Sequence, residues 1–536
     1  MRRLLLFAFL LIATPLAAQP ATPCASDSAT AVIEGRDVRA RLYTNGALFW
    51  RGSGNVYEVG GADAVFNTSF WIGGLVGDEP RVSATDYGPW EMWPGPLGSD
   101  GNPPADCAPH DRIYLVTTLD IARYRDTGEA SDDLRDWPAH LGAPTVDGDG
   151  ISDNYDLAAG DRPQLFGDQT AWWVMNDAGG DHGTTRSDPI QMEVQVTAYA
   201  FNQSGPLGET TFYRYRLVYR GSEPLTNAWT GFYADVDLGN ASDDYMATDS
   251  TRNMAYVYNG DDLDSGSAGY GAGPPALGYR FLETPPDANG QALGMTRAWI
   301  PTGSKVNFGI GGSPESAYDA LQGIWRGGVP LRRTARGYAP PSDDTSRVVR
   351  FVYPSDPLRK TFWSDFAPGR DSGPNTPTDR TLALTTGPFT MQPGQSHDLT
   401  LAIIYGRGAD HLDSIVKLRA NADGIAAAWA DGLSPNPLPP PPPQPPVLTV
   451  ISLRHLSEQP ASSLADFELG SGVDQAMRVE VYDAMGRRMS TLFDGEMSLD
   501  ERRTLTLDTS RFAPGVYFVH ARGRYTTATR ELIVVR

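Results

Sequence analysis

The sequence predicts a mainly β protein, built as a large antiparallel β-sandwich with a closing helix and followed by a small Ig-like β-sandwich. Short runs that alternate apolar with polar residues recur along the chain, as in residues 211–219 (TFYRYRLVY). The composition includes 57 glycines and 43 prolines, which supply turns between these runs. Residues 447–536 repeat the pattern with shorter strands, which is typical of a small sandwich.

Residues 1–18 have the pattern of a secretory signal peptide. Arg2 and Arg3 precede the apolar run LLLFAFLLIA, and the small residues Ala17 and Ala18 offer a cleavage site. The alternative, a membrane anchor, needs a longer apolar span. No later segment is apolar enough to cross a bilayer, so we expect an exported chain with no transmembrane segment after cleavage.

The charge composition argues against nucleic acid as a partner. The formal net charge is -21 and the only lysines are Lys305, Lys360 and Lys417, whereas nucleic-acid binding needs clustered basic residues. We therefore expect no nucleic-acid partner.

Cys24 and Cys107 are the only cysteines, and in an exported chain they favour a disulfide over the alternative of two free thiols.

Residues 24–434 form the predicted β-rich main region, either as one unit or as two lobes divided near residues 145–160. Runs such as RIYLVTTLD (residues 112–120) and VVRFVY (residues 348–353) are interpreted as strands. Near the end, residues 410–433 predict an amphipathic helix that packs on a sheet. Its apolar residues at helical spacing are Ile415, Leu418, Ala422, Ile425 and Trp429.

The segment TVDGDGISDNYD (residues 145–156) has the spacing of a calcium loop. Asp147, Asp149, Asp153 and Asp156 occupy positions three, five, nine and twelve of an EF-hand-like loop. It resembles the aspartate-rich loops of thrombospondin type 3 repeats and dockerins. The alternative is a loop of Asx turns that binds nothing, because Asp and Gly are ordinary turn residues.

A second acidic segment lies between two predicted strands. Asp235, Asp237, Asp243 and Asp244 crowd together there, and carboxylates this close repel one another unless a cation lies among them. Oxygen ligands of this kind suit Ca²⁺. A solvated acidic turn is the alternative.

Aromatic pairs and one histidine are candidates for ligand contacts. Trp90 and Trp93 could stack on sugar rings, but buried aromatic residues that cap a β core are the alternative interpretation. His182 lies among acidic residues and could be a metal ligand or a general base. A solvated turn residue is the simpler interpretation of this histidine.

The C-terminal part follows a run of prolines at residues 435–446, which predicts a semi-rigid spacer. Beyond it, VYDAMGRR, FAPGVYFV and the terminal RELIVVR occur in that order. With these motifs, residues 447–536 resemble the C-terminal sorting domain of type IX secretion substrates. The resemblance implies an outer-membrane translocon as partner, surface lipopolysaccharide as a site of attachment, and a secreted or cell-surface location. The main region resembles large secreted proteins of Bacteroidetes-type bacteria with the same tail, whose activity is not established.

No enzymatic motif stands out in the sequence. It has no Gly-x-Ser-x-Gly elbow, no His-Glu-x-x-His pair and no Cys-x-x-Cys. We therefore favour a secreted or surface-attached structural or adhesive module, stabilised by Ca²⁺, over an enzyme. The alternative is a glycan-binding protein or a glycoside hydrolase, which would need two facing carboxylates beside an exposed Trp.

Overall fold

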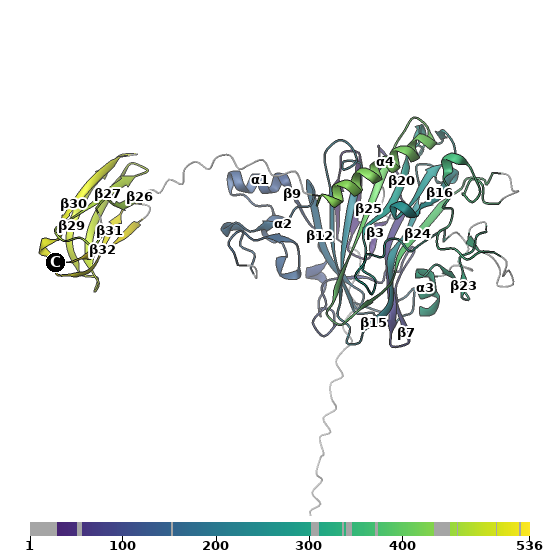
Figure 1. Cartoon of the computed structure of the whole chain (residues 1–536), viewed down its shortest axis with the longest axis horizontal. Helices are drawn as coiled ribbons and strands as arrows, with labels where there is room; N and C mark the ends of the chain where they lie inside the picture. Colours follow the sequence, from purple (N-terminus) through teal and green to yellow (C-terminus); the bar gives the residue numbers. More distant parts are fainter. Residues whose placement is uncertain are drawn as a thin grey trace, which may run out of the picture. The chain divides into compact units, whose positions relative to one another are not determined.

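The computed structural model describes residues 29–50, 56–151, 154–301, 310–334, 337–338, 346–369, 374–433, 451–457, 459–499, 501–524 and 527–535. The chain divides into two compact units, Met1–Asn436 and Pro437–Arg536. Both units are mainly β, as the sequence predicts (Figure 1). The predicted signal peptide, Cys24 and the proline-rich spacer lie outside the described residues.

The larger sheet of the first unit has nine antiparallel strands. Their order is β16-β17-β20-β25-β14-β13-β12-β8, and β9 also pairs with β12. The strands are β8 (Trp93–Pro94), β9 (Tyr114–Thr117), β12 (Gln169–Asn176), β13 (Met192–Ala200), β14 (Thr210–Tyr219), β16 (Asp244–Asp249), β17 (Met254–Asn259), β20 (Ala276–Glu283) and β25 (Ser396–Gly406). The run TFYRYRLVY thus forms a central strand whose side chains are mostly buried, with Arg216 exposed.

The second sheet has six strands and faces the first. Its order is β21-β24-β15-β6-β3, and β7 also pairs with β6. The strands are β3 (Ala47–Trp50), β6 (Asn67–Val76), β7 (Glu79–Ser83), β15 (Leu225–Val236), β21 (Arg297–Trp299) and β24 (Arg380–Met391). Phe70 of β6 stacks on Tyr215 of β14, with ring centroids 4.9 Å apart. Side chains of both sheets share one hydrophobic core, so the unit is a β-sandwich.

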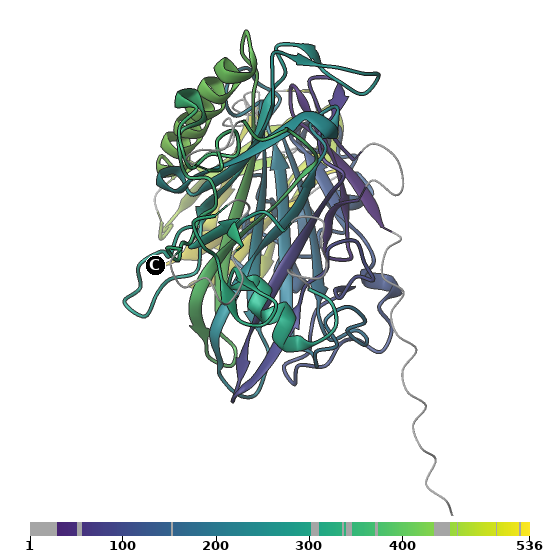
Figure 2. The same cartoon turned by 90° about the vertical axis from the view of Figure 1, so that its right-hand side faces the viewer.

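Helix α4 (His411–Ala430) covers the outer face of the nine-stranded sheet (Figure 2). It buries Ile415, Leu418, Ala422 and Ile425 in a cluster with Phe212 of β14, which confirms the predicted closing helix. Helix α3 (Pro314–Leu321) packs against β6 and β7. The sequence did not predict α3, because Gly, Pro and Ser dominate the surrounding residues.

Helices α1 (Thr118–Thr127) and α2 (Asp132–Arg135) follow β9. The interpretation of RIYLVTTLD as one strand is therefore wrong at its end. Thr117 and Asp120 form a capping box, in which the Thr117 hydroxyl accepts from the Asp120 amide at 3.1 Å. The cap starts the helix and overrides the strand preference of the two threonines.

Short strands complete the first unit. They are β1 (Thr30–Glu34), β2 (Val38–Tyr43), β4 (Tyr57–Val59) and β5 (Ala62–Asp63) in one sheet, with the pairs β10 (Thr145–Val146) and β11 (Arg162–Pro163), β18 (Leu263–Asp264) and β19 (Gly271–Ala272), and β22 (Ile324–Trp325) and β23 (Val329–Pro330). The β10-β11 pair closes the loop that contains the calcium motif. The predicted strand VVRFVY forms isolated bridges instead, at Val348 and Phe351.

The second unit is a small sandwich of two antiparallel sheets. Their orders are β26-β27-β30 and β29-β28-β31-β32. The strands are β26 (Ile451–His455), β27 (Leu464–Ser471), β28 (Gln475–Asp483), β29 (Arg488–Met497), β30 (Arg502–Asp508), β31 (Gly515–Arg522) and β32 (Thr527–Val534). Phe467, Val479 and Val519 lie in its own core. Across the described residues of both units, no helix has the length and apolar character needed to cross a membrane.

Candidate metal centre

Three groups of side chains in the described residues place possible metal ligands close together. Within each group, the ligand atoms lie within 4.8 Å of one another. Ligands on opposite sides of a Ca²⁺ ion lie about 5 Å apart, so each spacing suits one ion. The groups are Asp235, Asp237 and Asp379; Asp147, Asp149 and Asp161; and Asp262, Asp410 and His411. The three groups differ in the residues that surround them and in the hydrogen bonds that their carboxylates already accept.

The first group lies at one end of the six-stranded sheet. Asp235 of β15 is directly opposite Asn67 of β6 on one side and Thr381 of β24 on the other. Residues directly opposite in antiparallel strands project from the same face. Asn67, Asp235 and Thr381 therefore form a row across three strands. Asp237 follows Asp235 by two residues and Asp379 precedes Thr381 by two, so both lie just beyond the ends of β15 and β24.

This row contains buried oxygen atoms that lack a hydrogen-bond partner. Asn67 is 0% exposed, and its side-chain amide donates to the Asp86 carbonyl. Its Oδ1 then has no partner among the described residues, and the same holds for Asp235 Oδ1 and Thr381 Oγ1. Leaving a buried acceptor unsatisfied costs about 1–3 kcal/mol. A cation beside the row would satisfy these oxygens.

The charge of Asp235 is also unfavourable in the metal-free fold. Its Oδ2 accepts from the Tyr87 hydroxyl at 2.7 Å, and that hydroxyl accepts from Tyr233 at 2.8 Å. Burial raises the pKa of Asp235 to about 7. The hydrogen bond from Tyr87 acts in the opposite direction, whereas the negative charges of Asp379 and Asp237 raise the pKa further. A divalent cation at this point would favour the ionised carboxylates.

The other predicted members of this segment lie elsewhere. Asp243 accepts from the side chains of Asn259 at 3.0 Å and Asn240 at 3.3 Å. Asp244 is fully buried, accepts from the Leu238 amide at 3.3 Å, and has its pKa raised by burial. The structure therefore joins Asp235 and Asp237 to Asp379, which no spacing in the sequence indicates.

The second group lies in the loop between β10 and β11. Asp147 accepts from the backbone amides of Asp149 at 3.1 Å and Gly150 at 2.6 Å. Asp161 is 2% exposed and accepts from the amides of Gly148 at 2.8 Å and Asp156 at 2.7 Å. These backbone amides lower the pKa of Asp161. Backbone amides of the loop itself therefore donate to many of the acceptor positions on these carboxylates.

One predicted ligand of this loop does not join the group, and another cannot be placed. Asp156 caps the short turn Leu157–Ala159 by accepting from the amides of Ala158 and Ala159, and Asp153 lies outside the described residues. Asp161 is a member of the group that the motif did not include. It follows the motif directly before β11, so only the pairing of β10 with β11 brings it back to Asp147.

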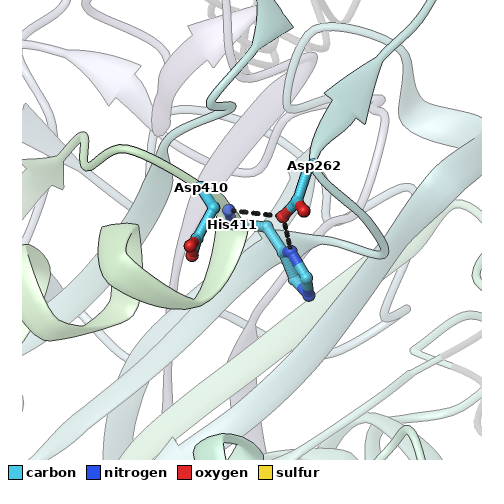
Figure 3. Close-up of side chains that lie close together, drawn as sticks. All are labelled: Asp262, Asp410 and His411. Atoms are coloured by element: carbon cyan, nitrogen blue, oxygen red, sulfur yellow. Dashed lines mark hydrogen bonds and ion pairs between the residues drawn. The ribbon is translucent and has the colours of Figure 1, made fainter.

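The third group is an ion pair beside a helix cap. His411 bonds to Asp262 through Nδ1 at 2.5 Å and through its backbone amide at 3.4 Å (Figure 3). This contact lowers the pKa of Asp262. Asp410 is the N-cap of α4 and accepts from the amides of Leu412 and Asp413 at 3.0 and 2.7 Å. Each side chain therefore has a structural role without a metal.

His182 and Trp93 belong to the core, whereas Trp90 is half-buried and packs edge-on against Trp50, with ring centroids 5.6 Å apart. The two ring nitrogens of His182 face the carbonyls of Val82 at 2.8 Å and Asp177 at 2.7 Å. Trp93 stacks on this ring, with centroids 5.9 Å apart, and Trp172 and Trp173 are also buried. His182 therefore has no ring nitrogen left for a metal or a substrate proton.

The predicted disulfide is described on one side only. Cys107 is disulfide-bonded. Its pairing with Cys24 stays a prediction, because Cys24 lies outside the described residues.

Known structures add little about the first unit. No curated protein matches the chain. A polysaccharide lyase aligns at 10% identity and a TM-score of 0.19, over 64% of this chain and 34% of the lyase, so the chain spans about a third of that protein. The CARDB domain of a Pyrococcus furiosus protein in complex with di-metal ions aligns at 18% identity and a TM-score of 0.13, over 16% of this chain and 91% of that domain. The EFF-1 fusogen on extracellular vesicles aligns at 7% identity and a TM-score of 0.12, over 64% of this chain and 66% of the fusogen. Scores this low support no argument about fold or function.

Most of the second unit matches a known domain family. Residues 459–535 match the family described as the secretion system C-terminal sorting domain. These residues cover β27 to β32, so they include most of the small sandwich. The chain therefore carries a sorting domain that is recognised by the type IX secretion machinery, and it is a substrate exported to the cell surface or beyond.

Proposed function

We propose that the first unit is an exported structural or adhesive module that Ca²⁺ stabilises at one end of the six-stranded sheet. Asp235, Asp237 and Asp379 supply the carboxylates, and Asn67 supplies an amide oxygen. The observation that carries the proposal is the pair of buried oxygens, Asn67 Oδ1 and Asp235 Oδ1, that have no partner among the described residues beside three carboxylates.

The ligand chemistry favours calcium among the common metal ions. All candidate ligand atoms here are oxygens from carboxylate and amide groups, which are the ligands that hard cations prefer. Ca²⁺ accepts mixed oxygen ligands in flexible geometry, whereas Mg²⁺ retains several waters and demands an octahedron. The loop with Asp147, Asp149 and Asp161 is a secondary candidate, because backbone amides already satisfy its carboxylates in part.

A glycoside hydrolase at this position is the weaker alternative. The raised pKa of Asp235 would suit a general acid, but its carboxyl group is out of reach of a substrate. Asp235 is 7% exposed, its Oδ1 is buried, and its Oδ2 is bonded to Tyr87. The arrangement therefore suits an ion held within the sheet end better than a glycosidic oxygen outside it.

Calorimetric unfolding of the full chain, in calcium and in chelator, tests the proposal. An ion that binds only the native state stabilises it by about 2.7 kcal/mol at a hundred times its dissociation constant. We expect Tm to rise with calcium in the wild type. Asp379→Asn should remove most of this rise, because it exchanges a charged ligand for a neutral one of the same shape.

Two matched variants sharpen the experiment. Asp132→Asn removes a charge from an exposed side chain in α2 and should leave the calcium response unchanged. Asp149→Asn tests the loop and should also leave most of the response. A Tm that ignores calcium would contradict the proposal, and a response lost in Asp149→Asn but kept in Asp379→Asn would move the site to the loop.

A further inference from the structure

The first unit also contains a cavity with a different chemistry. Its volume is about 380 Å³, and its lining includes three arginines and two aromatic residues: Arg333, Arg347, Arg350, Phe351 and Trp363. The calcium proposal uses none of these residues.

Backbone hydrogen bonds hold the arginines in place. The amide of Arg333 donates to the carbonyl of Arg347 at 2.8 Å. The carbonyl of Arg350 accepts from the amide of Ala298 in β21 at 3.1 Å. The segment with Arg347 and Arg350 is therefore tied on both sides, so the backbone that carries the three exposed arginine side chains is held before any ligand arrives.

The charges of these arginines are not neutralised by described residues. No carboxylate in the described part of the chain forms an ion pair with Arg333, Arg347 or Arg350, although arginines elsewhere, such as Arg252 and Arg380, do so. The cavity is thus a positive region on a chain with a net charge of -21. Burial, and after it the charge of Arg350, lowers the pKa of Arg297, which agrees with a positive local field.

Aromatic rings line the same cavity. The guanidinium of Arg350 lies 5.5 Å from the ring centroid of Phe351, and that of Arg333 lies 4.7 Å from the ring of Phe362. Trp363 is 2% exposed, and its Nε1 donates to the Thr334 carbonyl at 2.9 Å, so it belongs to the wall behind the cavity. The ring that a ligand can reach is that of the half-buried Phe351. Guanidinium groups bind carboxylates and sulfates through paired hydrogen bonds, and aromatic side chains offer an apolar surface to a sugar ring.

We propose that this cavity binds an anionic saccharide, with its carboxylate or sulfate groups on the arginines and a sugar ring against the half-buried Phe351. A single inorganic anion would leave most of the volume empty, whereas the cavity is in the size range of sites for small organic ligands. The site is separate from the calcium ligands and does not depend on them.

Titration calorimetry with the full chain tests this inference. The probes are oligogalacturonate for carboxylate groups, dextran sulfate oligomers for sulfate groups, and neutral dextran oligomers of equal length. We expect at least one anionic oligomer to bind, more weakly as salt rises, and neutral dextran not to bind. Arg333→Gln and Arg350→Gln should each weaken binding by about tenfold or more, since each removes charged hydrogen bonds.

Arg359→Gln is the matched control. Arg359 has a side chain that is 79% exposed and lies 3.9 Å from Asp356, outside the cavity lining, so its loss should not change binding. An unchanged Tm in each variant shows that the fold is intact. Equal binding of neutral and anionic oligomers, unchanged binding in Arg333→Gln and Arg350→Gln, or inorganic sulfate binding as tightly as either oligomer would each overturn the inference.

Discussion

Asp235 shows how its neighbours across the sheet decide the chemistry of one carboxylate. Along the chain it stands in an acidic segment and could be a solvated turn residue. In the fold it is a buried residue between Asn67 and Thr381, and burial raises its pKa to about 7. The same side chain is therefore a source of instability without a cation, and in the calcium proposal it becomes a ligand.

The stability of the metal-free chain should depend on pH through this residue. The folded pKa lies above the unfolded value of 3.8, so the associated stability is complete below about pH 4 and is lost as pH rises through about 7. The linkage amounts to at most about 4 kcal/mol. Urea unfolding in chelator, followed from pH 5 to 8.5, measures the loss.

Asp235→Asn identifies the residue responsible. The neutral side chain cannot ionise, so the variant should lack this loss and should exceed the wild type in stability at pH 8 in chelator. It should also lose the response to calcium. Parallel pH profiles for the wild type and Asp235→Asn would show that another group controls the stability.

At the scale of elements, α4 combines an apolar face with a strong start. Its buried face covers the nine-stranded sheet, and Asp410 satisfies two backbone amides at its N-terminus. Asp431 is at the opposite end as C-cap residue, where the helix dipole disfavours a negative charge. One helix thus has an aspartate in a favourable place and another in an unfavourable place.

We expect opposite results from removing these two aspartates. Asp410→Ala should lower the free energy of unfolding by about 1 kcal/mol, as loss of an N-cap does. Asp431→Ala should be neutral or slightly stabilising. Chemical denaturation of both variants in chelator measures the difference. Similar destabilisation by both would contradict the role given to the dipole at Asp431, and an unchanged free energy of unfolding in Asp410→Ala would contradict the role of the N-cap.

At the scale of the molecule, the candidate binding sites and the sorting domain lie in different units. The first unit contains all three acidic groups and the arginine cavity. The second unit contains the match to the sorting domain. Because each unit has its own hydrophobic core, we expect export and ligand binding to be separable.

Deletion of residues 447–536 tests this separation. The truncated chain should stay in the periplasm, because the translocon has no sorting domain to recognise, while its calcium-dependent Tm shift stays as in the full chain. A control replaces residues 435–446 with a Gly/Ser spacer of equal length and should still be exported. Export of the truncated chain would place the sorting information in the first unit.

The sequence by itself determined the features that local pattern encodes. Alternation in TFYRYRLVY predicts the central strand β14, helical spacing from Ile415 to Ile425 predicts α4, and ordered motifs predict the sorting domain. Local pattern also gave a wrong prediction. RIYLVTTLD is interpreted as one strand, but it ends in a helix because Thr117 and Asp120 form a capping box.

Only the tertiary structure decided which residues meet. Asp379 joins Asp235, and Asn67 lies opposite it, because the register of β6, β15 and β24 brings distant segments together. Arg333, Arg347 and Arg350 likewise share a cavity through backbone bonds between separate segments. A strand specifies its own alternation through its side chains, but its neighbours and their register follow from the packing of the whole sheet. The candidate sites depend on that packing.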